Sequence, residues 1–269
     1  MSRKPAKKAM PAWWERAEIP IGQQWEVTLG TLELTLARNP NEWILHSSSL
    51  DDNDASREPQ YRLSKGQPDN PKAERFVHAG DSHQVSLQPR LADRPVIIRP
   101  RQPIALLSGQ QITLYLSTPV WIDILVGEPP LLLKSLPAQR LSDTWFGPNT
   151  REGELCYSGR THARHNPRDL PDRPHRAITP LTIHNRATSP LPIEKISLPV
   201  PWLALYGDDA GRLWTQSVTL SRDSETDLAS VQIDSSDQAD GKALKRLAEP
   251  RQAAQRNNMI RAFSAWLGD

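Results

Sequence analysis

Cysteine is almost absent from this sequence: Cys156 is the single one among 269 residues. One thiol forms no intramolecular disulfide and supplies no zinc site built from thiolates, so a secreted disulfide-stabilised scaffold and a zinc ribbon are both excluded. Cys156 stands in the apolar segment LCY without a base beside it in the sequence. This setting favours a buried structural thiol over a reactive one.

Long apolar runs are also absent. A transmembrane helix needs about eighteen or more consecutive apolar residues, and no such stretch occurs. The N-terminal MSRKPAKKAMPAWWERAEIP is basic but lacks the apolar stretch that a signal peptide requires. We therefore expect a soluble, cytoplasmic protein in which residues 1–18 form a basic, poorly ordered leader.

Neither sign of charge dominates the composition. The chain has 33 Lys and Arg residues against 31 Asp and Glu residues, a net charge of +2. Bulk nucleic-acid binding needs a sustained positive excess, so nucleic acid is not an expected partner. Glycine is modest at 13 residues and proline is frequent at 25, which favours short strands joined by fixed turns.

The motifs of common active sites are missing as well. The sequence has no GxGxxG after a strand, no GK[ST] phosphate loop, no GxSxG elbow and no HExxH. These motifs belong to α/β or helical frameworks, and we expect neither a cofactor nor a metal site here. Binding is therefore a more natural expectation than catalysis.

Alternation of apolar and polar residues is the main structural signal that is present. The segment QQWEVTLGTLELTL alternates with a period of two on both sides of Gly30, which predicts a hairpin with one buried face. Residues 47–74 are polar and rich in turn formers, and we interpret them as a long loop or a short disordered insert. Further strand signals follow in RFVH, QVSLQ, PVIIR, PIALLS and QITLYLS. VWIDILVG, apolar apart from Asp123, predicts a strand buried on both faces.

These signals predict an all-β protein of one or two antiparallel β-sandwiches, immunoglobulin-like or jelly-roll-like. We expect a first half or domain at 19–128 and a second, immunoglobulin-like one at 129–236. The second contains a strand, the turn NRATSP and another strand, which resembles a hairpin of immunoglobulin-like folds. A C-terminal amphipathic helix is expected within 241–269. Its apolar face would consist of Met259, Ile260, Phe263, Trp266 and Leu267.

The segment RTHARHNPRDLPDRPHRAITPLTIHN, residues 160–185, is the main candidate site. Its arginines would repel a metal ion, whereas forked guanidinium groups suit phosphate and carboxylate. Histidines with a pKa of about 6.5 would make such a contact sensitive to pH. Alternatively, the segment is a solvated loop whose arginines pair with Asp169 and Asp172. The expected contacts with an anion or partner are Arg160, His162, Arg164, His165, Arg168, Arg173 and Arg176.

A second candidate lies in LSDTWFGPNTREGELCYSG, residues 141–159. Asp143 and Glu154 near Trp145 are the acid and base of an alternative interpretation, a hydrolase of a sugar or phosphate ester. That chemistry requires both carboxylates in one cleft, about 5 to 10 Å apart. Otherwise the aromatic loop packs inward and closes the end of the sandwich.

The two ends of the chain raise a membrane question. Basic residues at 3, 4, 7 and 8 precede Trp13 and Trp14, and the expected C-terminal helix is basic on its polar side. A basic amphipathic helix with aromatic residues suits an anionic bilayer. Alternatively, the helix covers a sheet edge or joins two subunits, which would make the protein a structural oligomer.

Three segments carry a family resemblance: LSDTWFG, GELCYSGRTHAR and RPHRAITPLTIHNRATSPLPIEKISLPVPWLALYGDDAGRLWTQSVTL. Together they resemble the uncharacterised prokaryotic family called domain of unknown function 432, over roughly residues 95–235. Members are similar in being encoded beside small-conductance mechanosensitive channels. The resemblance therefore implies an accessory protein with a partner in or near the inner membrane, for which the channel is the candidate. It transfers no catalytic residue.

Overall fold

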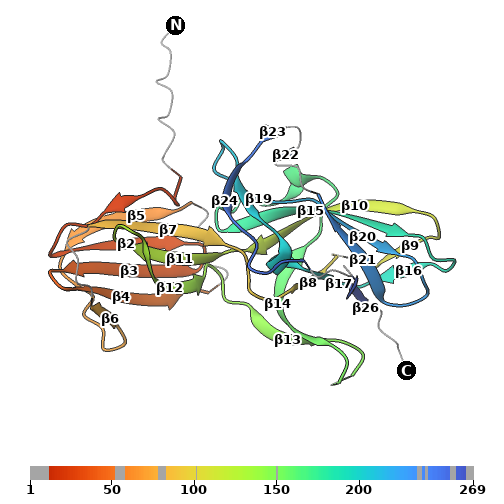
Figure 1. Cartoon of the computed structure of the whole chain (residues 1–269), viewed down its shortest axis with the longest axis horizontal. Coiled ribbons are helices and arrows are strands. Elements are labelled where there is room, and N and C mark those ends of the chain that lie inside the picture. The colour runs from red at the N-terminus through yellow and green to blue at the C-terminus, as the bar shows by residue number, and fades with distance from the viewer. Residues whose placement is uncertain are drawn as a thin grey trace, which may run out of the picture.

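The structure is a computed structural model that describes residues 12–51, 58–77, 83–100, 102–149, 151–234, 238–239, 242–254 and 259–264. Among these residues the regular elements are strands, apart from two single-turn 3-10 helices, η2 (Pro167–Asp169) and η3 (Val200–Trp202). The predicted all-β class is therefore confirmed. The molecule is elongated, with two lobes side by side along its long axis (Figure 1).

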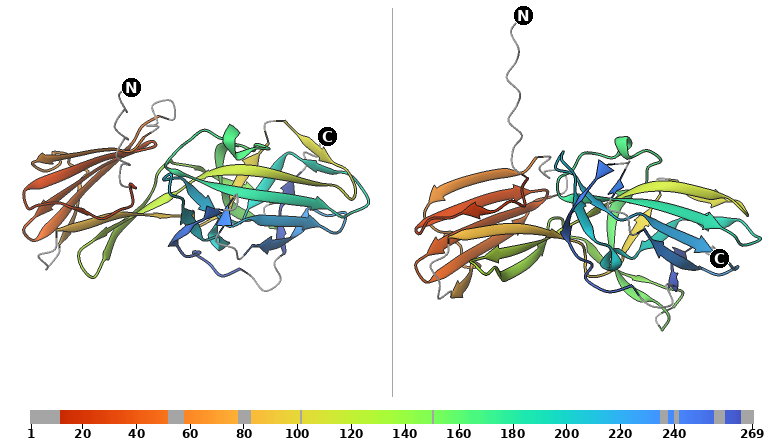
Figure 2. Two further views of the ribbon diagram at one scale, coloured as in Figure 1. Left: turned by 90° about the horizontal axis from the view of Figure 1, so that it is seen from above. Right: turned by 45° about the horizontal axis from the view of Figure 1, so that its top comes forward.

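The first lobe consists of two antiparallel sheets that form two layers (Figure 2). One sheet has the order β5-β2-β3-β4-β6, and the other has the order β1-β7-β11-β12. The strands of the first sheet are β5 (Gln60–Lys65), β2 (Gln23–Leu29), β3 (Leu32–Asn39), β4 (Glu42–Ser49) and β6 (Glu74–Val77). Those of the second sheet are β1 (Ala17–Glu18), β7 (Gln84–Arg90), β11 (Trp121–Val126) and β12 (Leu131–Pro137).

Two of the expected strand patterns are confirmed in this lobe. Strands β2 and β3 form the predicted hairpin, with Leu29 opposite Leu32 across the turn at Gly30. Strand β11 is buried along almost its whole length, as its apolar sequence indicates. The expectation of one long loop at 47–74 is wrong, because β5 lies within it and pairs with β2. Residues 52–57 of that stretch lie outside the described residues.

The second lobe is built around a mixed eight-stranded sheet. Its central strand β15 pairs with β10 along one edge, and with β19 and then β20 along the other. The strands are β24 (Lys245–Ala248), β18 (Leu205–Gly207), β19 (Leu213–Thr215), β15 (Arg176–Asn185), β20 (Val218–Arg222), β21 (Leu228–Ile233), β25 (Met259–Arg261) and β10 (Gln111–Pro119).

Three smaller sheets complete the second lobe. A five-stranded sheet has the order β13-β14-β8-β17-β26. Its strands are β13 (Ser142–Phe146), β14 (Glu154–His162), β8 (Val96–Arg99), β17 (Lys195–Leu198) and β26 (Phe263–Ser264). Two-stranded sheets are formed by β9 (Ile104–Leu106) with β16 (Leu191–Ile193), and by β22 (Gln238–Ala239) with β23 (Lys242–Ala243).

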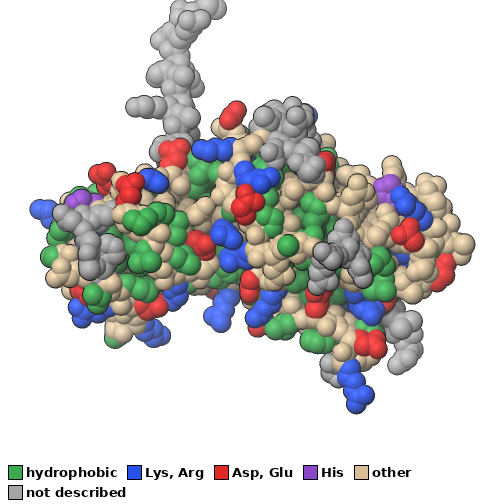
Figure 3. All heavy atoms as spheres, viewed as in Figure 1, with side chains coloured by type: hydrophobic (Ala, Val, Ile, Leu, Met, Phe, Trp, Pro, Cys, Tyr) green, Lys and Arg blue, Asp and Glu red, His purple; other side chains and the backbone are tan. Residues whose placement is uncertain are grey.

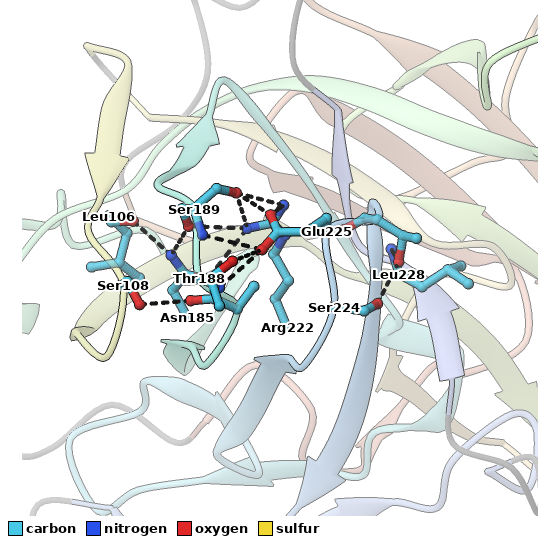
Figure 4. A network of polar contacts seen from close by, with 11 residues as sticks. Leu106, Ser108, Asn185, Thr188, Ser189, Arg222, Ser224, Glu225 and Leu228 are labelled. Atoms are coloured by element: carbon cyan, nitrogen blue, oxygen red, sulfur yellow. Dashed lines mark hydrogen bonds and ion pairs between the residues drawn. The ribbon is translucent and has the colours of Figure 1, made fainter.

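The turn at 186–190 carries the chain from one sheet to another. The strands on both sides of NRATSP form as expected, but β15 pairs with β10, whereas β16 pairs with β9, so they are not a hairpin. The turn is held by Asn185 Nδ2, which donates to the carbonyl oxygens of Leu106 (2.9 Å) and Ser189 (2.8 Å). Glu225 Oε1 accepts from the backbone N–H groups of Thr188 (2.9 Å) and Ser189 (3.1 Å), as Figure 4 shows.

The expected C-terminal helix is wrong. In the described part of 241–269, β25 pairs with β21 and β26 pairs with β17. These two strands extend two different sheets, and both Ala262 between them and Phe263 of β26 are buried. A pair of open sheet edges therefore decides the conformation of a segment whose apolar spacing also suits a helix. Residues 255–258 and 265–269 lie outside the described residues. An oligomer joined through that helix loses its structural basis.

The chain crosses between the two lobes at 91–95, at residue 120 and at 138–141. Backbone hydrogen bonds link these crossings: Thr31 N donates to Ala138 O (3.3 Å), Ala138 N to Val120 O (2.9 Å) and Val120 N to His175 O (3.0 Å). One hydrophobic cluster contains core residues of both lobes, for example Leu34 and Leu181. The division of the chain into separate units at 19–128 and 129–236 stays a prediction.

Gly30 and His175 pack against each other at this junction. Gly30 has φ of +63°, and a Cβ added to it would lie 2.6 Å from the His175 ring. His175 is 1% exposed, and neither ring nitrogen has a hydrogen-bond partner among the described residues. Burial, together with the charges of Arg176 and Arg173, lowers the pKa of His175 to about 3. The ring therefore packs as a neutral imidazole.

We expect Gly30→Ala to destabilise the protein by about 2 to 5 kcal/mol, because it combines a strained positive φ with a clash against the buried ring. Gly109→Ala is the matched control: Gly109 has φ of +72° but nothing within 4 Å of an added Cβ. In urea unfolding, Gly109→Ala should lower the free energy of unfolding by the backbone contribution alone, about 1 to 2 kcal/mol. Equal costs for the two variants would contradict the steric role of His175.

We expect the protein to lose stability as the pH falls from 6.5 to 4.5. The folded pKa of His175 is depressed, so the unfolded chain takes up the proton first, and stability present above pH 6.5 is lost toward pH 3. The loss amounts to about 1.4 kcal/mol per pH unit. His175→Phe, or His175→Leu if the larger ring does not fit, should flatten this dependence in chemical unfolding. An unchanged slope would show that His175 is not its source.

Candidate functional site: an arginine pocket

The loop at 163–175 is held at both ends and in the middle. Arg164 exchanges backbone hydrogen bonds with Tyr115 of β10, at N···O distances of 3.0 and 2.7 Å. Near the other end, Trp13 Nε1 donates to the carbonyl oxygen of Pro174 (3.0 Å). Between them, the Asn166 side chain caps η2 by accepting from Arg168 N (2.9 Å). The loop is therefore fixed on the second lobe.

This loop forms one wall of a pocket of about 270 Å³. The other wall comes from Ser117 of β10, Ile178 of β15 and the residue before β19, Arg212. We call this site the arginine pocket, after its four guanidinium groups. Its charged lining residues are Arg168, Asp172, Arg173, Arg176 and Arg212, and Pro167, Leu170 and Pro171 complete the loop side.

Arg176 is a buried member of the pocket lining, with 6% of its surface exposed. Its Nε donates to Ser117 Oγ (3.0 Å) and its Nη1 to Gln139 Oε1 (2.5 Å), and Nη2 donates to the carbonyl oxygen of Ser117. These contacts fix the guanidinium plane. The positive charge of Arg176 adds to the electrostatic potential of the pocket. Because Arg176 is buried, salt screens this charge much less than it screens an exposed one.

Arg212 is held in place by Asp208 and Trp214. Its Nε donates to Asp208 Oδ2 (2.9 Å), and its guanidinium carbon lies 5.3 Å from the Trp214 ring centroid. Burial raises the pKa of Asp208, but hydrogen bonds from Arg212 and Trp214 outweigh it and lower the pKa overall. Asp208 therefore stays ionised and orients Arg212. No local motif indicated this residue, because it lies 36 positions after Arg176.

Arg168 and Arg173 are the available cations of the pocket. Both are exposed, and among the described residues neither guanidinium forms an ion pair or hydrogen bond. The alternative in which these arginines pair with Asp169 and Asp172 is not seen in the described part of the chain. With four arginines and one aspartate, the lining carries a local excess of positive charge. Elsewhere, basic and acidic side chains are interspersed over the face in Figure 3.

Of the remaining predicted residues, Arg164 and His165 do not belong to the described lining of this pocket. The side chains of Arg160 and His162 lie outside the described residues, although the backbone of both belongs to β14. Arg164 is half-buried and His165 is exposed. The structure thus brings together three of the seven expected contacts and adds Arg212. The expected pH-sensitive histidine contact remains a prediction, because His165 is not part of the lining.

Asp143 and Glu154 do not share a cleft. On the β13–β14 hairpin, Asp143 lies opposite Tyr157 and Glu154 lies opposite Phe146. Tyr157 and Glu154 are three positions apart on one strand, so the two carboxylates point to opposite faces. Asp143 accepts from Arg94 Nη1 (3.0 Å), whereas burial raises the pKa of Glu154. The arrangement does not provide the acid and base pair of a hydrolase.

Cys156 is buried, and its environment does not favour a reactive thiol. It packs with Ile97 and Phe146. Burial, with the nearby charge of Glu154, raises its pKa to about 12, so the thiol stays protonated. Among the described residues there is no group of three or more His, Cys, Asp or Glu side chains placed to hold a metal ion. Within the same residues, no helix has the length and apolar character needed to span a membrane.

Comparison with known proteins identifies the chain at the level of its family. No curated protein and no solved structure matches it. A family model described as "Protein of unknown function (DUF432)" matches residues 13–267, which is nearly the whole chain and extends well beyond the segments that carry the resemblance. The chain belongs to the DUF432 family.

Proposed function

We propose that this protein is a non-enzymatic binding protein whose arginine pocket takes an anionic group, phosphate or carboxylate, from a ligand or protein partner. The observation that carries the proposal is that two uncommitted guanidinium groups, Arg168 and Arg173, share a pocket with two immobilised ones, Arg176 and Arg212. Guanidinium groups in fixed orientation suit bidentate contacts with such anions.

Preorganisation supports this assignment. Binding costs side-chain and loop ordering, and this cost falls when the loop is already fixed. The contacts of Arg164 with Tyr115 and of Pro174 with Trp13 hold the loop before any ligand is present. Only the long side chains of Arg168 and Arg173 would be ordered on binding.

For the cellular setting, we propose an accessory role in the cytoplasm, at the inner face of the membrane and beside a membrane protein such as a channel. The family resemblance supports this part. Trp13 is buried against Pro174 and Trp14 is half-buried, so neither serves as a free aromatic anchor in a bilayer. We therefore favour contact with a protein over direct insertion. We also propose that each lobe is a β-sandwich, with the second one immunoglobulin-like.

The double substitution Arg168→Glu with Arg173→Glu should weaken pyrophosphate binding by at least about a hundredfold. A hydrogen bond to a charged group contributes about 1.5 to 3 kcal/mol, so each lost contact costs about tenfold or more in Kd. Isothermal titration calorimetry with pyrophosphate, and with citrate as a carboxylate probe, measures this at low and high salt. Binding should weaken with salt because the two arginines are exposed.

Arg62→Glu is the matched control, because Arg62 is an exposed arginine on β5 of the other lobe. It changes the net charge by the same amount per residue without touching the arginine pocket. Equal loss of binding in this control would attribute the effect to overall charge. Absence of any pyrophosphate or citrate binding to the unmodified chain would refute the proposed anion site.

A further inference from the structure

A second pocket, of about 330 Å³, lies between the two lobes, and we call it the junction pocket. One wall is the outer face of β7, where Gln84, Ser86 and Gln88 alternate with residues that are buried in the core of the first lobe. The opposite wall is β24 of the second lobe, with Lys245, Arg246 and Leu247. Gln88 Nε2 donates to Leu247 O (3.0 Å), which joins the two walls.

The described charged residues that line the junction pocket are all basic. They are Arg16, Lys245 and Arg246, and no Asp or Glu belongs to the lining in the part of the chain that the structure describes. Arg246 is engaged by Glu249 (3.1 Å) and by the Tyr206 hydroxyl (3.0 Å). Lys245 is exposed and forms no ion pair among the described residues. Among the described residues, Arg16 has a single polar side-chain contact, 3.4 Å from its Nη1 to Gln84 Oε1. Two cations are thus available to an anion.

Trp14 gives the same pocket a flat apolar surface in a fixed orientation. Its ring meets Trp13 edge to face, with centroids 5.4 Å apart and planes at 77°. Trp13 is itself buried and bonded to Pro174 O. Trp14 also lies close to Gly207, where an added Cβ would be 3.0 Å from its Cζ2 atom. Leu125 and Leu247 add apolar surface to the lining.

We infer that the junction pocket binds a small phosphorylated compound that carries a planar ring, of the size of a mononucleotide. The phosphate would contact Lys245 and Arg16, and the ring would pack on Trp14, since aromatic faces stack with flat rings. Gln88, whose Nε2 is bonded to Leu247 O, can accept a hydrogen bond from the polar edge of the ring through its Oε1 atom. A volume of a few hundred Å³ suits such a ligand.

This site is separate from the arginine pocket, with which it shares no lining residue. Its walls come from both lobes, so a bound ligand bridges them. Ligand that binds only the assembled walls stabilises the folded arrangement by mass action. The site therefore predicts a rise in melting temperature that depends on ligand concentration, in addition to binding itself.

The test uses the full chain and three probes in calorimetry: adenosine 5′-monophosphate, adenosine and inorganic phosphate. We expect the monophosphate to bind at least tenfold more tightly than either part alone, and to raise the melting temperature. Lys245→Glu and Arg16→Glu should each weaken it at least tenfold. Trp14→Leu should weaken both monophosphate and adenosine. Arg62→Glu should leave monophosphate binding unchanged. The double variant Arg168→Glu with Arg173→Glu removes anion binding at the arginine pocket, and in it the monophosphate should still bind more tightly than adenosine or inorganic phosphate.

Several outcomes would overturn the inference. Failure of the monophosphate to bind at millimolar concentration would exclude this ligand class. Equal affinity for inorganic phosphate would reduce the site to an unspecific cationic surface. Loss of binding in the Arg168 and Arg173 variant, with Lys245→Glu unaffected, would move the ligand to the arginine pocket. Because pyrophosphate and citrate test the arginine pocket, the two proposals fail independently. If Trp14→Leu does not fold, Trp14→Phe with the two charge variants decides the question.

Discussion

The arrangement of the two lobes depends on a series of backbone hydrogen bonds across the junction. The series runs from Thr31 through Ala138 and Val120 to His175. Each of these residues belongs to a turn or a crossing segment, where the regular ladders of the sheets stop. Without these hydrogen bonds, buried backbone N–H and C=O groups in all of these segments would have no hydrogen-bond partner. The absence of a side chain at Gly30 allows His175 to approach closely enough to complete the series.

Ion pairs of a buried aspartate form a second interaction near this junction. Asp123 on β11 lies 3.8 Å from Arg90 and 4.0 Å from Arg251, measured between side-chain nitrogen and oxygen atoms. Arg251 Nε also donates to Leu91 O (2.6 Å) in the first crossing. A buried aspartate is tolerated when it is paired, and removal of one partner would leave charge uncompensated. The segment around residue 251 is thereby held against the first lobe, although neighbouring strands belong to the second.

The short segment at 13–16 connects both proposed sites. Trp13 bonds to Pro174, next to Arg173 of the arginine pocket, while Trp14 and Arg16 line the junction pocket. This segment was expected to be part of a poorly ordered leader. In its described residues Trp13 is buried, and the following Ala17–Glu18 form β1, which pairs with β7. Residues 1–11 of the expected leader lie outside the described residues.

The sequence by itself determined the local strand structure, because a period of two depends only on neighbouring residues. The β2–β3 hairpin and the almost wholly buried strand β11 follow from such patterns. The concentration of arginine in one loop is visible in the sequence directly. Tertiary structure decided which strands pair with one another and which side chains they bring together. Met259–Arg261 is a strand because β21 offers it an edge, and Arg212 joins Arg168 because parallel pairing of β15 with β19 brings it there. Asp143 and Glu154 are separated by strand parity once their hairpin register is set. Contacts between distant segments depend on which edges and faces remain unpaired after the local strands form, and no short window of sequence contains that information.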